Sequence, residues 1–243
     1  MPDRPGSHHR HRVPAVVIAH AVWRYHRFAL SRRDVEERLY ERLYERGIVV
    51  TPETVRAWVA QFAARYAADL RPRASRPGRT WHLDEVFTRV GGRQVYLWRA
   101  VDEHGQVLDV LVQECRDADA AERFFRRLLA SVGGPPAAIV TDGLASYGAA
   151  KVRVPELAAV EHRRVRAAAR LNNRVEQSHQ PTRVRESVMR RFKSVASAQR
   201  FLAAFSAFCN HFRPRRHLLT AAEYRIVRHV RYASWRELSS AVA

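Results

Sequence analysis

The sequence predicts a two-part chain, in which an all-α segment precedes a mixed α/β domain. Apolar residues in the first 70 positions recur at the three- and four-residue spacing of helices. A stretch rich in Arg and Pro at 71–80 interrupts this pattern, and short β-branched and aromatic runs follow it. We therefore expect a disordered basic arm at 1–12, an all-α domain at 13–70, a basic linker at 71–80 and an α/β domain at 81–243.

The charge of the chain predicts a polyanionic partner. The 243 residues carry a formal net charge of +19, from 43 basic and 24 acidic side chains. Lys151 and Lys193 are the only lysines, so nearly all of the positive charge is Arg, which forms bidentate contacts with phosphate and guanine. A GC-rich genome would also favour Arg over Lys, but it would not explain the sign of the charge. Nucleic acid is the expected partner.

Two function classes are disfavoured by composition. The two cysteines, Cys115 and Cys209, form no Cys-x-x-Cys pair, so a zinc finger or a disulfide scaffold is not expected. The longest early apolar run, 13–22, is too short to cross a bilayer. We expect a soluble protein of the reducing cytoplasm that is not associated with a membrane.

The all-α segment has the outline of a helix-turn-helix. One helix is expected over 13–30 and a second from an N-cap at Ser31 to Gly47. Thr51 and Pro52 begin a third helix. Its outward positions are available for DNA: Thr54, Arg56, Ala57, Gln61 and Arg65. An ordinary helical hairpin with a solvated face is the alternative.

The α/β segment predicts an RNase H-like order of elements. Strands are expected over three runs that form a meander, followed by an amphipathic helix and an apolar strand. These are 81–90, 93–102, 107–114, the helix 117–132 and the strand 137–141. A short loop or helix, a possible fifth strand near 160–162, a helix from 172 interrupted by Pro181, and C-terminal helices complete the prediction.

Three acids are the candidate catalytic and metal-binding residues. Asp84 lies inside the first strand, Asp142 ends the apolar strand, and Glu176 lies in a helical stretch. Glu85 should point to the opposite face from Asp84, because side chains alternate along a strand. Carboxylate oxygens suit Mg²⁺, and two such ions promote phosphodiester transfer. The spacing of these acids is not diagnostic by itself. His162 and His179 could contact DNA or the metal shell, but lone histidines are more often structural.

A set of motifs makes this interpretation specific. They are Trp-His-Leu-Asp-Glu-Val at 81–86, Tyr-Leu-Trp-Arg-Ala-Val-Asp at 96–102, Ile-Val-Thr-Asp-Gly at 139–143, Leu-Asn-Asn-Arg-Val-Glu-Gln-Ser-His-Gln-Pro-Thr-Arg at 171–183 and Met-Arg-Arg-Phe-Lys-Ser at 189–194. Together they resemble the transposases of the insertion-sequence-six family, and the resemblance spans nearly the whole chain. In that family the D-D-E acids fall on the positions of Asp84, Asp142 and Glu176.

The resemblance implies a function, and a location in the bacterial cytoplasm in association with the nucleoid. It implies a catalytic domain of the RNase H type, a helix-turn-helix that binds terminal inverted repeats, and Mg²⁺ dependence with replicative movement through cointegrates. We expect two Mg²⁺ ions, with Mn²⁺ as a substitute, and DNA 3′-end cleavage followed by strand transfer to target DNA. Arg190, Arg191 and Lys193 are expected to contact DNA backbone, with a solvated basic face as the alternative. Two element ends imply a homodimer or a higher homo-oligomer.

Two features depart from the family pattern. Gly143 stands where the family usually has Lys after the second Asp, which removes a cation near the phosphate. The tetrapeptide Glu37–Tyr40 is repeated at once as Glu41–Tyr44. A four-residue insertion in a helix adds about 6 Å and a rotation of about 40°. We hypothesise that it misaligns the recognition helix and weakens binding to the element ends.

Two other functions remain open from the residues alone. One is a helix-turn-helix DNA-binding protein with an inactive RNase H-like domain. The other is a structure-specific RNase H-like nuclease, which would cut a bare junction without element ends. Metal-dependent strand transfer that is lost in Asp84→Ala would distinguish the transposase from both.

Overall fold

The computed structural model describes residues 13–165 and 173–241, without the side chains at positions 42, 46, 173–177 and 241. Its elements in chain order are α1 (Ala15–Arg27), α2 (Arg32–Leu43), η1 (Tyr44–Arg46), α3 (Pro52–Leu70), η2 (Arg71–Arg73), β1 (Thr80–Val90), β2 (Arg93–Asp102), β3 (Val107–Gln113), α4 (Ala118–Val132), β4 (Ala138–Thr141), α5 (Ala145–Arg153), η3 (Pro155–Leu157), β5 (Glu161–Arg164), α6 (Asn173–Val188), α7 (Val195–Phe212), η5 (Arg216–Leu218) and α8 (Ala221–Ala241). No helix in these ranges is long and apolar enough to cross a membrane.

The chain divides into two compact units. One contains residues 1–74 and 207–243, and the other contains residues 75–206. The boundary at 74 lies inside the stretch that was predicted as a linker. The second boundary lies within α7, so the C-terminal residues belong with the N-terminal helices, whereas the sequence pattern had grouped them with the α/β domain.

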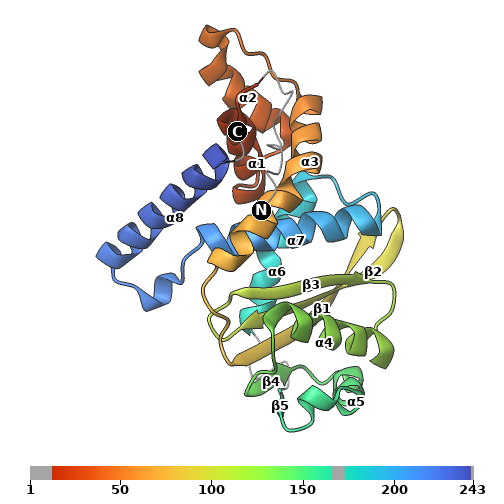
Figure 1. Cartoon of the computed structure of the whole chain (residues 1–243). Helices are drawn as coiled ribbons and strands as arrows, with labels where there is room; N and C mark the ends of the chain where they lie inside the picture. Colours follow the sequence, from red (N-terminus) through yellow and green to blue (C-terminus); the bar gives the residue numbers. More distant parts are fainter. Residues whose placement is uncertain (1–12, 166–172, 242–243) are drawn as a thin grey trace, which may run out of the picture. The chain divides into compact units, whose positions relative to one another are not determined.

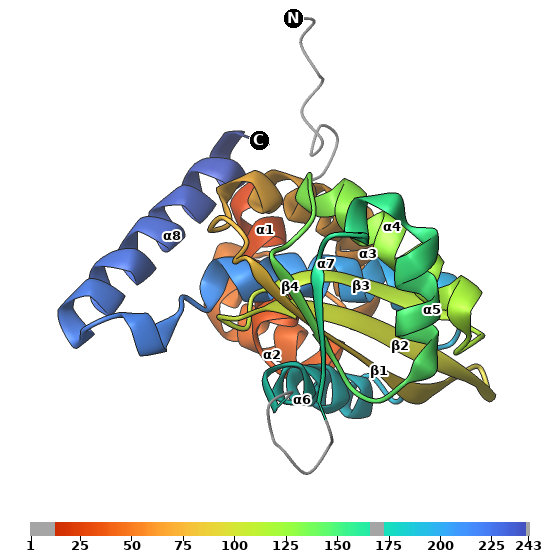
Figure 2. The same cartoon turned by 90° about the horizontal axis from the view of Figure 1, so that it is seen from below.

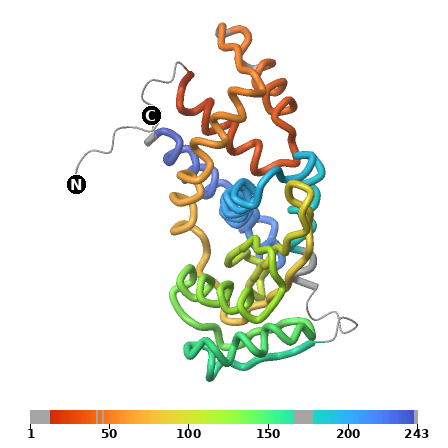
Figure 3. Tube along the Cα trace, turned by 90° about the vertical axis from the view of Figure 1, so that its right-hand side faces the viewer, coloured from red at the N-terminus to blue at the C-terminus, as the bar shows by residue number. Residues whose placement is uncertain are grey.

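In the helical unit, local capping explains where α2 and α3 begin, and Figure 3 shows the trace of α1, α2 and α3. Ser31 and Asp34 form a reciprocal capping box, in which each side chain accepts from the backbone N–H of the other. Thr51 caps α3 by accepting from the N–H of Thr54. Gly47 has a φ of 65°, the left-handed conformation that ends the helical segment. The α-helical part stops at Leu43, and a 3₁₀ turn carries the chain to Gly47.

The repeated tetrapeptide is accommodated at the end of α2. Leu39 and Leu43, at equivalent positions of the two copies, are both buried, while Tyr40 and Tyr44 are both exposed. The two tyrosine rings lie 5.1 Å apart. Residues four apart share one helix face, so the second copy continues the buried and exposed faces of the first.

The α/β unit is built around a five-stranded sheet of order β3-β2-β1-β4-β5 (Figure 1). β1, β2 and β3 form an antiparallel meander, while β4 pairs in parallel with both β1 and β5. α4 and α5 cover one face of the sheet and α6 lies on the other (Figure 2). This meander, crossover helix and parallel strand are the order that the sequence predicted.

The core lies on the face covered by α4 and α5. Its members are apolar and nearly inaccessible, and they include Trp81, Leu83, Trp98, Phe124 and Tyr147. Large aromatic side chains dominate this core and supply much of the buried apolar area. Both β1 and β4 contribute to this core, with Trp81 and Leu83 from β1 and Ile139 from β4.

One local prediction was wrong. The sequence predicted that Pro181 interrupts its helix, because proline lacks an N–H and clashes with the preceding turn. In the structure α6 continues from Asn173 to Val188 with Pro181 inside it. The buried Arg99 on β2 donates to the carbonyl of Ser178 and to the hydroxyl of Thr182. These two bonds hold the segments on either side of Pro181 against the sheet.

Candidate active site

Asp84 and Asp142 come from neighbouring parallel strands at the same level. Thr80 lies opposite Ala138 and His82 lies opposite Val140 in the β1–β4 ladder. Continuing that register by two residues places Asp84 opposite Asp142, which directly follows β4. The backbones of neighbouring strands are about 5 Å apart. The fold therefore places at corresponding positions of adjacent strands two acids that are far apart in the sequence.

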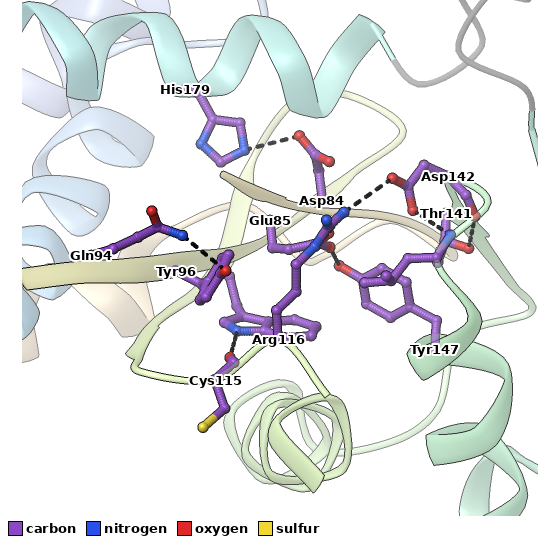
Figure 4. A network of polar contacts seen from close by, with 12 residues as sticks. Asp84, Glu85, Gln94, Tyr96, Cys115, Arg116, Thr141, Asp142, Tyr147 and His179 are labelled. Carbon is purple, nitrogen blue, oxygen red and sulfur yellow. Dashed lines mark hydrogen bonds and ion pairs between the residues drawn. The ribbon is translucent and has the colours of Figure 1, made fainter. Parts of the chain in front are cut away.

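Asp84 faces α6. Its carboxylate lies 3.4 Å from Nε2 of His179, whose side chain is buried, and its own side chain is 15% exposed (Figure 4). Burial lowers the pKa of His179 below 6.5, although the nearby Asp84 carboxylate acts in the opposite direction. The imidazole is therefore neutral at pH 7. Asp84 also pairs across the ladder with Arg99, the residue that anchors α6.

Glu85 points to the opposite face from Asp84, as the alternation of the strand predicted. Its carboxylate is fully buried and accepts hydrogen bonds from the Tyr147 hydroxyl and from the Arg116 guanidinium, both at 2.6 Å (Figure 4). Burial raises the pKa of Glu85, and the hydrogen bonds from Tyr147 and Arg116 oppose that change. Glu85 thus serves as an internal anchor and not as a ligand beside Asp84.

Arg116 connects this anchor to Asp142. The side chain follows β3 and is 42% exposed, and its Nη2 lies 4.0 Å from a carboxylate oxygen of Asp142. Partial burial acts to lower the pKa of Arg116, but the hydrogen bond and the charge of Glu85 outweigh it and raise that pKa above the usual value of an arginine. A fixed positive charge therefore lies beside the second acid.

The turn after β4 fixes the backbone at Asp142. One carboxylate oxygen accepts from the N–H of Leu144 at 3.0 Å, which closes a tight turn before α5. The hydroxyl of Thr141 donates to the carbonyl of Asp142 and lies 2.9 Å from Nε2 of His162. Apart from its two chain neighbours, no residue that the structure describes has an atom within 4 Å of a Cβ built at Gly143, so a larger side chain would meet no described neighbour there.

Glu176 is the third predicted acid, and its backbone belongs to α6. Its side chain lies outside the described residues. Glu176 precedes His179 by three positions, a spacing that places two residues on one face of a helix. His179 contacts Asp84, so the α6 backbone directs this face toward the first acid.

The described donors suit a hard divalent cation in kind, because carboxylates are oxygen ligands and two of them occupy corresponding positions of adjacent strands. Asp142 is 33% exposed, so this position is open to a ligand. Among the side chains that the structure describes, no cluster of three or more His, Cys, Asp or Glu is placed to hold a metal ion. A complete ligand set would need Glu176.

The predicted DNA-contacting residues fall into two groups. On α3, Arg56 and Gln61 are exposed, while Thr54 and Arg65 are partly exposed. In the α/β unit, the exposed Arg190, Arg191 and Lys193 belong to the turn between α6 and α7.

Sequence reasoning missed Arg116, Tyr147 and Arg99. Arg116 stands two positions past the end of a predicted strand, which is a weak signal. The partners of Tyr147 and Arg99 are distant in sequence, and nothing local indicated them.

Comparison with known proteins identifies the family. A model described as a DDE domain matches residues 78–215. The transposase for insertion sequence-like element IS431mec of Staphylococcus aureus strain Mu50 is 31% identical over 186 residues, covering 76% of this chain and 80% of that protein. The transposase for insertion sequence element IS257 in transposon Tn4003 of Staphylococcus aureus matches with the same identity and coverage.

Two further matches are more limited. An uncharacterized protein, pYV0051 of Yersinia pseudotuberculosis, is 39% identical over 77 residues, covering 31% of this chain and 72% of that protein. A chain in the cryo-EM structure of the simian T-cell lymphotropic virus intasome with PP2A regulatory subunit B56 gamma aligns with a TM-score of 0.42. That alignment has 15% identity over 57% of this chain and 49% of that chain, which is too low to bear on fold or function.

The predicted RNase H-like fold is confirmed by the sheet order together with the DDE-domain match. A DDE domain implies a divalent metal cofactor, and a transposase acts on DNA. The match covers more than half of the chain, and the relatives are aligned over most of their length. The chain therefore belongs to the DDE transposases of insertion sequences, of the insertion-sequence-six type.

Proposed function

We propose that Asp84, Asp142 and Glu176 together hold Mg²⁺ and that this site cleaves the 3′ ends of the element and joins them to target DNA. The observation that carries the proposal is the register of β1 and β4, which, continued by two residues, sets Asp84 opposite Asp142. The helical spacing from Glu176 to His179, which contacts Asp84, supports the third member. Two Mg²⁺ ions, or Mn²⁺ in their place, suit this set of oxygen ligands.

The chemistry needs an activated oxygen nucleophile and stabilisation of a leaving oxyanion. Mg²⁺ held by these acids would supply both, by lowering the pKa of water and by neutralising developing charge on the phosphate. The protein supplies geometry. Neutral His179 limits the positions open to the Asp84 carboxylate, and Arg116, locked to Glu85, does the same for Asp142.

Binding of the element ends is proposed for α3. Thr54, Arg56, Gln61 and Arg65 lie on or near its accessible face, and α2, a turn with Gly47 and α3 form the predicted helix-turn-helix. Recognition of terminal inverted repeats by this helix, and of target DNA by the α/β unit, is part of the proposal. A homodimer or a higher homo-oligomer would supply one acidic site for each end.

Strand transfer in vitro tests the proposal. Labelled element-end DNA is incubated with a target plasmid and Mg²⁺, and nicked and joined products are resolved on a denaturing gel. Asp84→Asn, Asp142→Asn and Glu176→Gln should each abolish both products while retaining binding to the ends. Asp119→Asn, which removes an exposed acid on α4, is the matched control and should keep both.

Two results would reject this assignment. One is full cleavage by Glu176→Gln. The other is cleavage of bare junctions by the unmodified protein without any requirement for element ends, which would favour a structure-specific nuclease.

A further inference from the structure

A groove in the α/β unit leads away from the candidate active site. Its outer part, with a volume of about 790 Å³, lies between the β1–β2 turn and the α6–α7 turn. Its inner part, of about 430 Å³, lies between β1 and α6 and includes His179 in its wall. The two parts share Arg89, Arg183, Glu186 and Arg191, so they form one continuous depression. We call it the strand groove.

The charge of the strand groove is strongly positive. Its wall carries five exposed cations: Arg89, Arg183, Arg190, Arg191 and Lys193. None of these five described side chains has an ion pair with a described acid. The acid that lines both parts, Glu186, accepts a hydrogen bond from the Thr88 hydroxyl at 2.5 Å. An excess of unneutralised Arg and Lys in a depression favours a phosphate backbone.

One face of α6 joins the groove to the acids. His179, Arg183 and Ser187 follow one another at intervals of four residues, which places them along one side of the helix. The first of them lies 3.4 Å from the Asp84 carboxylate. A ligand that follows this side of α6 therefore runs from the acidic pair to the cations of the α6–α7 turn.

The α6–α7 turn is held in place by its own backbone and by a buried side chain. Phe192 is buried against Phe201, and its carbonyl accepts from the N–H of Gly91 at 3.1 Å. A Cβ at Gly91 would approach the carbonyl oxygen of Lys193 to 2.9 Å, so glycine permits this close approach of the two turns. The exposed cations are thus presented from a fixed frame.

Arg190 and Arg191 occupy backbone positions that favour other residues. Their φ angles are 54° and 69°, the left-handed region in which Gly and Asn are the least costly residues. The turn itself requires no side chain at either position, because its contacts with α6 are made by the backbone. The N–H of Arg190 donates to the carbonyl of Ser187, and the N–H of Arg191 donates to the carbonyl of Glu186. Long cations at two strained positions indicate a use for the side chains.

We propose that the strand groove binds the sugar–phosphate backbone of one DNA strand as it leaves the Asp84–Asp142 pair. The inference rests on the proposed function, and it adds the path and the single-stranded form of the DNA. The size supports one strand, since depressions of 300–1,000 Å³ hold a molecule of drug size, which corresponds to a few nucleotides and not to a duplex. Binding depends on charge and not on base sequence.

The test measures affinity of the full-length protein for a fluorescent oligodeoxythymidylate of about 12 nucleotides, by anisotropy, with metal removed by a chelator. Two double variants that remove both charges are compared with the unmodified protein. One carries Arg190→Gln and Arg191→Gln, and the other carries Arg190→Gly and Arg191→Gly. The glycine pair relieves the strained backbone, so it should fold at least as well as the unmodified protein. The control is a double variant that loses the same charge outside the groove. It carries Arg153→Gln and Arg163→Gln.

Loss of two phosphate contacts should reduce the steepness of the plot of log K for DNA binding against log salt concentration by about 1.4. The affinity at 0.1 M salt should correspondingly fall about 25-fold. The control pair should stay within about twofold of the unmodified protein. Photo-cross-links from a bromodeoxyuridine-substituted strand should map to 86–93 and 183–193. An unchanged affinity in both groove pairs, an equal loss in the control pair, or a loss confined to duplex DNA would overturn the inference.

These outcomes are separate from those that test the active site. If Asp84→Asn still cleaves, the proposed function fails while strand affinity without metal is unaffected. If the groove pairs bind and cleave like the unmodified protein, the groove inference fails while the acids retain their role.

Discussion

Removing the guanidinium of Arg116 should destabilise the α/β unit, because it leaves the Glu85 carboxylate without its counter-charge. The Glu85 side chain is fully buried, and two Arg116 nitrogens lie 2.6 Å from one of its oxygens. Removing one partner of a buried pair costs about 3–5 kcal/mol. Arg116 is 42% exposed and Tyr147 still donates to Glu85, so Arg116→Gln should lower the free energy of unfolding by about 2–3 kcal/mol.

The assay is urea unfolding followed by tryptophan fluorescence, since Trp81 and Trp98 are buried in the same core. Adding Glu85→Gln to Arg116→Gln should restore at least half of the lost stability, because a neutral amide needs no counter-charge and can still accept from Tyr147. Arg153→Gln removes an exposed pair and should leave the midpoint nearly unchanged. A loss below about 0.5 kcal/mol in Arg116→Gln, or no recovery in the double variant, would refute this account of the network.

Three other perturbations test separate features. Gly143→Lys should change the free energy of unfolding by less than about 0.5 kcal/mol, because a Cβ at Gly143 meets no atom of the described residues beyond its chain neighbours. The added cation should raise DNA affinity about fivefold at 0.1 M salt by making one phosphate contact. A loss of folding would contradict this expectation. Nε2 of His211 lies 3.0 Å from the carbonyl of Arg231, and burial lowers the pKa of His211 in the folded protein. As the pH falls, this imidazole is therefore protonated at a higher pH in the unfolded chain than in the folded protein. The free energy of unfolding should then decrease as the pH drops below about 6.5. His211→Asn should flatten that pH dependence in urea titrations, and an unaltered slope would exclude the contribution. Deleting Glu41–Tyr44 should strengthen binding to the inverted repeats in a gel-shift assay if the insertion misaligns α3, and unchanged or weaker binding would end that hypothesis.

Much of the backbone could be predicted because its determinants are local. The caps at Ser31 and Thr51 act over three residues, and Gly47 acts at its own φ angle. Alternation along β1 placed Asp84 and Glu85 on opposite faces, and the structure confirms it, with His179 on one side and Tyr147 on the other. The periodicity of apolar residues and the capping of helix ends depend only on residues that are close together in the sequence.

The parts that could not be predicted depend on partners far away in the chain. Pro181 remained helical because Arg99, on another element, bonds to either side of it. The link from Glu85 through Arg116 to Asp142 joins three elements whose register no local pattern specifies. The strand groove likewise requires the β1–β2 turn to lie against the α6–α7 turn. The hydrogen bond from the N–H of Gly91 to the carbonyl of Phe192 joins these two turns.

The most direct test of the shared acidic site is cleavage of the protein by hydroxyl radicals from Fe²⁺ bound in place of Mg²⁺. With ascorbate and peroxide, breaks should occur together near Asp84, Asp142 and Glu176, and excess Mg²⁺ should suppress all of them. Asp84→Asn should remove the breaks near the other two acids as well. Breaks near Asp84 and Asp142 without any near Glu176 would show that the third acid does not join the site, and would contradict the proposed arrangement.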